Sequence, residues 1–527
     1  MTTPDNSNCT SNNASAAPAT NLFLSLEELT VLEVDRPSES EAVLKEVDTS
    51  AHNDSTFDLP EGSFVILTET ELFNKQQEVV NECTGNDNDG TGRSRASSFS
   101  VASLSDLDFV LGEAPFQVKN WDGHKKYSDM ILEGQLYKQK HGHPETPINN
   151  IVMLFESPST STEDTSFYNS KKFRFHDWPP LKSGRPKGVL GPCRYALMNG
   201  NAYPVFLRED PPVGLLDHWR KSVPGYVEPT FVKTIDRENQ TVYAYLPVES
   251  IPNHVNDPGV HYHMAGKDAI HLMTQKTTHL LPDTKSRPCV VKTTHSMGSK
   301  GIFIINNDQD EEEFEQFLEV SGRPTYVITD FVDIHRNVAC HFFMHPDGKR
   351  VTWYGSNENH RMPGTKHFSS DSIIFLKDQQ ELKELQLPFV EEVCKYCHSV
   401  GFWGFAGIDV LFDSQQNGYL VDINPRVTGS CPAIMTLQLL NAQFGFEVAL
   451  FRRSGNVTFA GPAKELVELV DAYNEEHMGK SRIVLASFLE VVSGVKTKMN
   501  IGVYGNDMSE CKEVLDRFAQ PDFSVEA

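Results

Sequence analysis

The chain has 527 residues and a formal net charge of −25, and 39% of its residues are hydrophobic. This length allows two or three domains with sizeable cores, while the acidic charge argues against a general nucleic-acid-binding protein, because phosphate contacts need lysine and arginine. No apolar run approaches the roughly 20 residues of a membrane-spanning helix, and the first residues lack the basic and apolar segments of a signal peptide. We therefore expect a cytoplasmic protein that binds neither membranes nor nucleic acids.

Residues 1–110 differ from the rest of the chain, because they contain 20 acidic residues but only 5 lysines and arginines. A segment this polar and charged cannot bury enough apolar surface to offset the entropy lost on ordering. The sequence therefore predicts a long disordered acidic tail. The nine cysteines are scattered, which fits a reducing compartment. Cys394 and Cys397 form one CxxC pair, and without a second pair we expect core packing rather than a zinc site.

Residues 111–260 alternate predicted helix and strand, which is typical of an α/β domain. A helix is expected over 122–140, and strands are expected over 150–155, 202–207 and 241–246. No catalytic pattern is recognisable in this region. A further helix is expected over 266–280, directly after it.

Residues 289–305 are predicted to form a strand, a glycine-containing loop and a second strand. Such a loop can direct several backbone N–H groups at one anion, and Lys292 at the end of the first strand adds a positive charge. The same pattern also fits an ordinary hairpin, in which Ser296, Ser299 and Lys300 are only surface polar residues.

The segment that follows is predicted to extend the sheet and to cover it with helices. Helices are expected over 311–320, 379–400 and 463–477, strands over 326–332, 338–344, 351–354 and 482–492, and a polar loop over 357–364.

Residues 407–430 contain two apolar runs, each carrying one acid, Asp409 and Asp422, with a turn-rich link between them. This pattern predicts two neighbouring strands joined as a hairpin. Asn424 shares a face with Asp422 because strand side chains alternate, and Arg426 follows two residues later. Oxygen ligands at this density suit Mg²⁺. The alternative is that both acids are solvated edge residues, or that one is paired with Arg426.

The order of these parts resembles the ATP-grasp superfamily over roughly residues 260–445, and the DINPR string after IDVLFD is its most specific feature. Enzymes of this superfamily join a carboxylate to an amine or another nucleophile through an acyl phosphate. The resemblance implies ATP and Mg²⁺ (or Mn²⁺) as cofactors. It also implies roles for individual residues: phosphate contacts by Lys267, Lys292 and the loop with His295, Ser296, Met297, Gly298, Ser299 and Gly301, adenine and ribose contacts by Asp330, Phe331 and Val332, metal ligands Asp409, Asp422 and Asn424, and Lys292 and Arg426 as catalytic residues.

Three positions depart from the family pattern. Asp330 stands where the family usually has glutamate, and Ile334 to Asn337 replace its usual Gly-x-Glu, so the ribose contact is not identified. Asp422 replaces a commoner glutamate, although aspartate also binds Mg²⁺. These changes indicate a divergent member.

We therefore predict an α/β (α+β ATP-grasp) enzyme that forms an amide or peptide bond between small amino-acid-like carboxylate and amine substrates. The expected products include ADP and phosphate. The alternatives are a carboxylase-like enzyme and a non-catalytic ATP-binding regulatory or scaffold protein. The oligomeric state is open, and a homodimer is compatible with the sequence. The predicted division is a tail (1–110), an N-terminal α/β domain (111–260), the ATP-grasp domain (261–450) and a C-terminal segment completing it (451–527).

Overall fold

The computed structural model describes residues 32–34, 44–46, 116–156, 172–175, 189–296, 301–360 and 371–521. The chain divides into two units, Met1–Gln77 and Glu78–Ala527. In the first unit, strand β1 (Leu32–Val34) pairs antiparallel with β2 (Leu44–Glu46). The predicted disorder of residues 1–110 otherwise falls outside the described residues.

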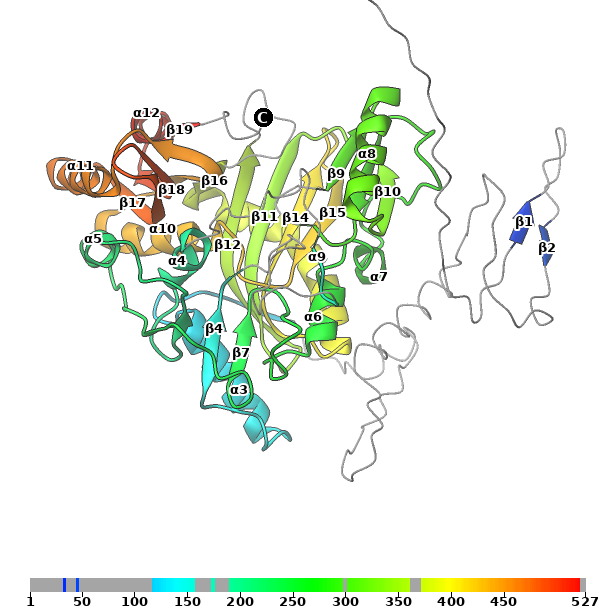
Figure 1. Cartoon of the computed structure of the whole chain (residues 1–527), viewed down its shortest axis with the longest axis horizontal. Coiled ribbons are helices and arrows are strands. Elements are labelled where there is room, and N and C mark those ends of the chain that lie inside the picture. Colours follow the sequence, from blue (N-terminus) through cyan, green and yellow to red (C-terminus); the bar gives the residue numbers. More distant parts are fainter. Residues whose placement is uncertain are drawn as a thin grey trace, which may run out of the picture. The chain divides into compact units, whose positions relative to one another are not determined.

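A large sheet forms the centre of the second unit (Figure 1). In the described part of the chain its strand order is β15-β14-β11-β12-β13-β16-β18-β17, with β3 beside β12 and β19 beside β16. All its pairings are antiparallel except that of β3 with β12. The bounds of these strands are β3 Gln117–Asn120, β11 Arg336–Met344, β12 Arg350–His360, β13 Asp371–Phe375, β14 Gly404–Phe412, β15 Gly418–Asn424, β16 Val448–Phe459, β17 Ser481–Val492, β18 Lys496–Gly505 and β19 Gln520–Pro521.

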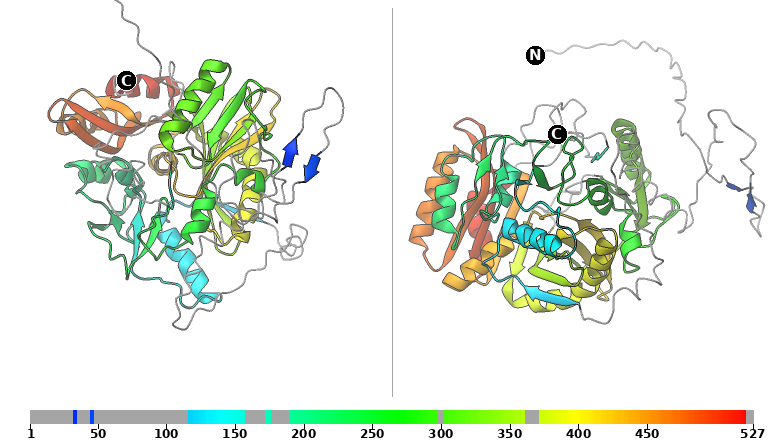
Figure 2. Two further views of the ribbon diagram at one scale, coloured as in Figure 1. Left: turned by 45° about the vertical axis from the view of Figure 1, so that its right-hand side comes forward. Right: turned by 90° about the horizontal axis from the view of Figure 1, so that it is seen from below.

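Two smaller sheets flank the large one. The first is parallel, as expected for an α/β region, with the order β6 (Phe231–Val232), β5 (Val205–Phe206), β4 (Ile151–Leu154) and β7 (Thr241–Ala244). The second is antiparallel, with the order β10 (Tyr326–Asp330), β8 (Cys289–Thr293) and β9 (Ile302–Ile305). Figure 2 shows these sheets from two further directions.

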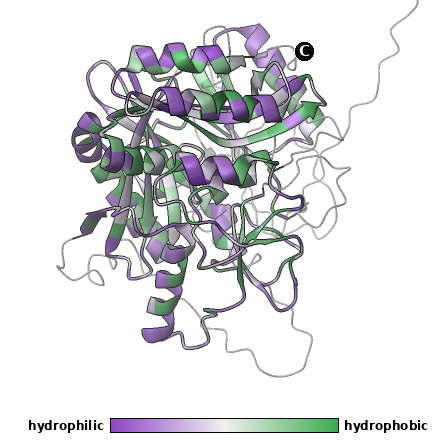
Figure 3. Cartoon of the chain, turned by 90° about the vertical axis from the view of Figure 1, so that its left-hand side faces the viewer, coloured by the Kyte–Doolittle hydropathy of each residue, from purple (hydrophilic) through white to green (hydrophobic). Residues whose placement is uncertain are grey.

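Helices cover the sheets with one apolar side each, and their ribbons are banded purple and green in Figure 3. Helix α9 buries Leu382, Phe389 and Val393 at helical spacing. Cys394 and Cys397 are buried in the same core, which is the packing role predicted for them. The helices are α3 Tyr127–Lys140, α4 Leu190–Ala196, α5 Leu215–Ser222, α6 Pro258–Met264, α7 Ile270–Met273, α8 Asp308–Ser321, the 3₁₀ helix η1 Leu376–Asp378, α9 Gln379–Ser399, α10 Cys431–Phe444, α11 Ala463–Glu476 and α12 Met508–Phe518. Within the described residues, no helix is long and apolar enough to cross a membrane.

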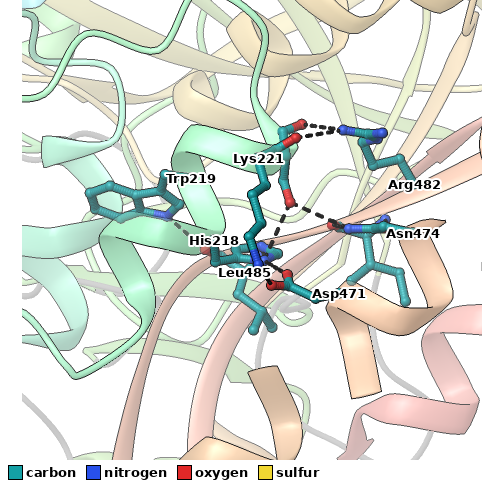
Figure 4. A network of polar contacts seen from close by, with 9 residues as sticks. His218, Trp219, Lys221, Asp471, Asn474, Arg482 and Leu485 are labelled. Carbon is teal, nitrogen blue, oxygen red and sulfur yellow. Dashed lines mark hydrogen bonds and ion pairs between the residues drawn. The ribbon is translucent and has the colours of Figure 1, made fainter. Parts of the chain in front are cut away.

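A buried polar network joins α5 to α11 and β17 (Figure 4). His218 Nδ1 donates to Asp471 Oδ1 at 2.7 Å, and His218 Nε2 accepts from the backbone N–H of Leu485 at 3.0 Å. The side chain of Asn474 bonds the backbone N–H and C=O of Ile483 at 2.7 and 2.8 Å. Each polar group that these contacts bury therefore has a protein partner, so the network stabilises the packing of α5 against α11 and β17.

Two predicted elements differ in the structure. The predicted helix over 266–280 is only one turn, α7, because Thr274 is extended and the following backbone pairs with strands: Leu420 N–H donates to Lys276 O, and Leu281 N–H donates to Ile328 O. The predicted loop over 357–364 was also wrong in part, because β12 continues to His360 by pairing with β13. Its remaining positions fall outside the described residues.

Candidate active site

The two hairpin acids lie opposite one another at the edge of the large sheet. Asp409 on β14 and Asp422 on β15 are direct register partners, and a bulge follows Asp409. Asn424 Nδ2 lies 3.4 Å from Asp409 Oδ2 and 3.3 Å from Asp422 Oδ2, so it bridges the two carboxylates. Burial and the negative charge of Asp422 raise the pKa of Asp409. The predicted juxtaposition of Asp409, Asp422 and Asn424 is therefore present, and an additional cation here would relieve like-charge repulsion.

A chain of hydrogen-bonded polar side chains that leads from Asp409 was missed in the sequence analysis. Asn359 Nδ2 donates to Asp409 Oδ1 at 3.2 Å, and Asn359 Oδ1 accepts from Asn357 Nδ2 at 2.9 Å. Asn357 Oδ1 in turn contacts His341 Nε2 at 2.8 Å and Ser430 Oγ at 2.8 Å. The N-x-N alternation on β12 was the available signal, since both amides face the same side of a strand. This chain orients one oxygen of Asp409.

Two lysines lie beside the acids. Lys267 Nζ forms an ion pair with Asp422 Oδ1 at 2.8 Å, and only 5% of the Lys267 side chain is exposed. Lys292 on β8 is also buried, and its pKa is lowered to about 8 by burial and by the charge of Lys267, against the opposing effect of Asp422. The structure thus brings together both lysines and both acids, although they come from separate parts of the chain.

The glycine-containing loop has a defined beginning and end. Ser296 is buried, and its hydroxyl has no hydrogen-bond partner among the described residues. Gly301 has φ +123°, and a Cβ there would lie 2.3 Å from Thr293 Oγ1, so only glycine fits. Met297, Gly298, Ser299 and Lys300 fall outside the described residues.

His295 has protein partners on both ring nitrogens. Its Nε2 lies 3.0 Å from the carbonyl oxygen of Tyr262, its Nδ1 lies 3.3 Å from Thr294 Oγ1, and its ring stacks on Tyr262 with centroids 3.7 Å apart. Burial lowers the pKa of His295 to about 4. These contacts anchor the loop through a neutral imidazole and leave no ring nitrogen turned toward an anion.

The predicted hinge lies where β10 ends. Asp330 is the last residue of β10, and its carboxylate contacts His279 Nδ1 at 2.7 Å. Phe331 is 37% exposed, and the backbone from Phe331 to Ile334 is irregular before β11 begins. Among the described residues, no side-chain hydrogen bond or ion pair joins Asp330 to the acids and lysines of the cluster, and the nucleotide contacts expected of Asp330, Phe331 and Val332 stay predictions.

Arg426 lies next to the acids and is 8% exposed. Its Nη2 donates to Asn424 Oδ1 at 2.6 Å, its guanidinium lies 4.9 Å from the ring centre of Tyr245, and its buried Nε has no partner among the described residues. Burial would raise the pKa of Tyr245, but the charge of Arg426 and the hydrogen bond from Tyr195 outweigh burial and lower it. Among the described residues, no ion pair within 4.0 Å joins Arg426 to Asp409 or Asp422. This excludes the alternative in which one of the acids is paired with Arg426.

The residues present fit a divalent cation. Two carboxylates and an amide are a suitable protein share for Mg²⁺, which keeps several waters and is completed by substrate phosphates. In the described part of the chain no group of three or more His, Cys, Asp and Glu side chains could hold a metal without such help. Asp422 Oδ1 already has a cationic partner in Lys267 Nζ, at 2.8 Å.

Comparison with known proteins identifies the region that contains this cluster. A family model described as L-aspartate–L-methionine ligase, ATP grasp, matches residues 267–424, from the first lysine to the bridging asparagine. No curated protein sequence matches the chain.

Solved structures with similar backbones are distant. An N5-carboxyaminoimidazole synthetase from Staphylococcus aureus has 15% identity and a TM-score of 0.39, with 63% of this chain and 94% of that chain covered. The biotin carboxylase domain of Hydrogenobacter thermophilus 2-oxoglutarate carboxylase has 11% identity and a TM-score of 0.40, covering 61% and 86%. An L-amino acid ligase from Bacillus licheniformis has 18% identity and a TM-score of 0.31, covering 50% and 74%. At these TM-scores we base the assignment on the family model alone.

The match covers the strand–loop–strand segment, the hinge and the acidic hairpin, which are the parts that carried the resemblance in the sequence. It favours the ligase prediction over a regulatory or scaffold protein. Residues 267–424 of this chain belong to the ATP-grasp superfamily of ligases.

Proposed function

We propose that the protein joins two amino acids, or closely similar small molecules, into a dipeptide-like amide with ATP as the energy source. The observation that carries the proposal is the meeting of Asp409 and Asp422 with the buried lysines Lys267 and Lys292. The description of the matched family as an L-aspartate–L-methionine ligase supports amino acids as substrates, with aspartate and methionine as the first pair to test.

The reaction begins at the substrate carboxylate. One carboxylate oxygen attacks the γ-phosphorus of ATP, the bond from that phosphorus to the β–γ bridging oxygen breaks, and ADP leaves. The amine then attacks the carbonyl carbon of the acyl phosphate, inorganic phosphate leaves with the C–O bonding electrons, and the amine gives up its proton. The amine itself is the nucleophile, so no protein nucleophile is needed.

The side chains contribute charge and position. Lys267 and Lys292 would hold phosphate oxygens, and Arg426 would hold the carboxylate and the oxyanion that forms when the amine attacks. Asp409, Asp422 and Asn424 would hold Mg²⁺ or Mn²⁺, which neutralises the charge between the carboxylate and the triphosphate. Asn359 would keep Asp409 oriented through its 3.2 Å hydrogen bond.

The test is ADP release by the full-length protein with Mg²⁺, ATP and pairs of amino acids, followed by mass spectrometry of the product. We expect a dipeptide-like product and, by phosphorus NMR, ADP with inorganic phosphate. AMP with pyrophosphate would contradict attack at the γ-phosphorus. Turnover that requires bicarbonate and consumes one substrate would support the carboxylase-like alternative, and unchanged ATP with every pair would contradict catalysis.

A further inference from the structure

A buried histidine has no role in the reaction proposed above, although its hydrogen bonds lead to two parts of the candidate active site. His341 is on β11, and only 2% of it is exposed. Burial lowers the pKa of His341 to about 4, so at neutral pH its ring is uncharged and has a single N–H. Both ring nitrogens have hydrogen-bond partners, and these partners come from different elements of the fold.

The first set of contacts leads from His341 to Asp409. His341 Nε2 lies 2.8 Å from Asn357 Oδ1. Asn357 Nδ2 donates to Asn359, which donates to Asp409. An ionised carboxylate only accepts hydrogen bonds, so Asn359 must turn its NH₂ group to Asp409 and its carbonyl oxygen to Asn357. By the same argument the carbonyl oxygen of Asn357 is the acceptor at His341. The ring proton of His341 is therefore on Nε2, and Nδ1 is an acceptor.

The second set of contacts leads to the loop that follows Arg426. Thr428 Oγ1 donates to His341 Nδ1, and Ser430 Oγ lies 3.1 Å from His341 Nε2. Ser430 is the residue before α10, so the two hydroxyl groups stand between Arg426 and the start of that helix. His341 therefore fixes this loop to β11 at two points.

The sheet leaves room for the loop at Gly407, which is the register partner of His341 on β14. A Cβ on Gly407 would lie 2.5 Å from the methyl carbon of Thr428 and 3.2 Å from His341 Nδ1. Carbon atoms that are not bonded to each other lie about 3.5–4.0 Å apart at their optimal separation, so a larger residue would push Thr428 away from His341. Glycine at this position therefore allows Thr428 to lie against the ring.

We propose that His341 is a positioning residue that holds Asp409 and Arg426 at a fixed separation. Through the two asparagines it holds the carboxylate, and through the two loop hydroxyl groups it holds the backbone that follows the arginine. This inference rests on the proposed function, in which Asp409 would hold the metal and Arg426 the substrate carboxylate. A change in their separation should therefore weaken metal-dependent nucleotide binding and lower kcat.

The test separates metal-dependent nucleotide binding from nucleotide binding alone in the full-length protein. Calorimetry measures the Kd of the ATP analogue AMP-PNP with Mn²⁺ and, separately, with EDTA. We expect His341→Asn to weaken binding about 10-fold with Mn²⁺ and less than about twofold with EDTA, because it removes support from a metal ligand and not from the nucleotide contacts. His341→Gln should recover most of the loss, because its longer side chain can place an amide N–H where Nε2 stands.

Gly407→Ala is a second variant that keeps every polar group. Its methyl group must displace Thr428, so we expect kcat for ADP release to fall roughly 10- to 100-fold while the KM for ATP changes less than about twofold. His345→Gln is the matched control. His345 is also buried, and burial lowers its pKa to about 4, but its Nε2 is bonded to Thr352 Oγ1 at 2.9 Å. The control should leave both kcat and Mn²⁺-dependent binding unchanged.

Nitrogen-15 NMR of the metal-free protein reports the tautomer of His341, and we expect the proton on Nε2. A proton on Nδ1 would overturn the inference while leaving the proposed function intact, as would equal effects of His341→Asn and His345→Gln on Mn²⁺-dependent binding. If no pair of amino acids releases ADP, the proposed function is contradicted. Loss of Mn²⁺-dependent binding in His341→Asn, with recovery in His341→Gln, would still support the positioning of Asp409.

Discussion

Two polar clusters of this protein differ in how far their polar groups and charges are satisfied by protein partners. In the network around His218 and Asp471, the buried donors and acceptors satisfy one another (Figure 4). In the cluster around Asp409 and Arg426, like charges face each other and buried donors remain without partners among the described residues. The satisfied network around His218 stabilises the fold, whereas the cluster around Asp409 has charges that a ligand can neutralise. The difference indicates which of two equally polar regions is the functional one.

Replacing a carboxylate of the second cluster should have the largest effect. Asp409→Asn and Asp422→Asn should each lower kcat roughly 100-fold or more, because each removes charge needed for the metal bridge. Thermal unfolding should show that Asp409→Asn is no less stable than the wild type, since it relieves repulsion between two neighbouring acids. Near-normal turnover in Mg²⁺ by either variant would mean that these residues are not metal ligands.

Two residues of the cluster around Asp409 and Arg426 should affect different kinetic constants. Lys292→Met should raise the KM for ATP roughly 10- to 100-fold, because it would remove the phosphate contact proposed for this lysine. Arg426→Met should instead lower kcat by a similar factor, because its contact develops in the transition state. Steady-state kinetics with each substrate varied in turn measures both. A similar loss of ATP affinity in the two variants would contradict the role given to Arg426.

The network around His218 should respond in the opposite way. His218→Ala removes one of the two partners of Asp471 and leaves the N–H of Leu485 without its acceptor, so we expect a loss of about 2–4 kcal/mol in the free energy of unfolding. The activity per folded molecule should not change. Lys221→Gln is the control, because Lys221 is 62% exposed and its bond to Asp471 should contribute little. A loss of activity without a loss of stability would show that the network around His218 is part of the active site.

The pH dependence of stability should show a smaller effect of the same network. Burial would raise the pKa of Asp471, but the hydrogen bonds from His218 and Lys221 outweigh burial and lower it. The ionised carboxylate therefore stabilises the fold above its unfolded pKa of about 3.9, and this contribution is lost as the pH falls through the lower folded pKa. Urea unfolding between about pH 2 and pH 5 should have a shallower pH slope in Asp471→Asn than in the wild type. An unchanged slope would mean that Asp471 is not held ionised by the network.

Local sequence patterns were enough to predict those parts of the site that lie close together along the chain. Asp409, Asp422 and Asn424 could be placed on one face because a short hairpin and the two-residue period of a strand leave little freedom. Lys292 was identified for a similar local reason, as the polar end of an apolar strand before a glycine-containing loop. The family resemblance then supplied Lys267 and the reaction class, and the match over 267–424 agrees with it. The domain boundaries and the roles of the site residues stay predictions.

Contacts between residues that are distant in the sequence could be identified only from the folded structure. Asn359 on β12 reaches Asp409 on β14 across the intervening strand β11, and this contact depends on the order of strands in the sheet. Helix α7 has only one turn for a similar reason, because the backbone after it pairs with β15 and β10 instead of continuing the helix. Sheet order and pairing depend on which distant apolar faces are buried together, and local periodicity does not contain that information. Arg452 has ion pairs with Asp371 and Asp516, whereas Arg453 has none among the described residues, and this difference likewise depends on partners that no local pattern predicts.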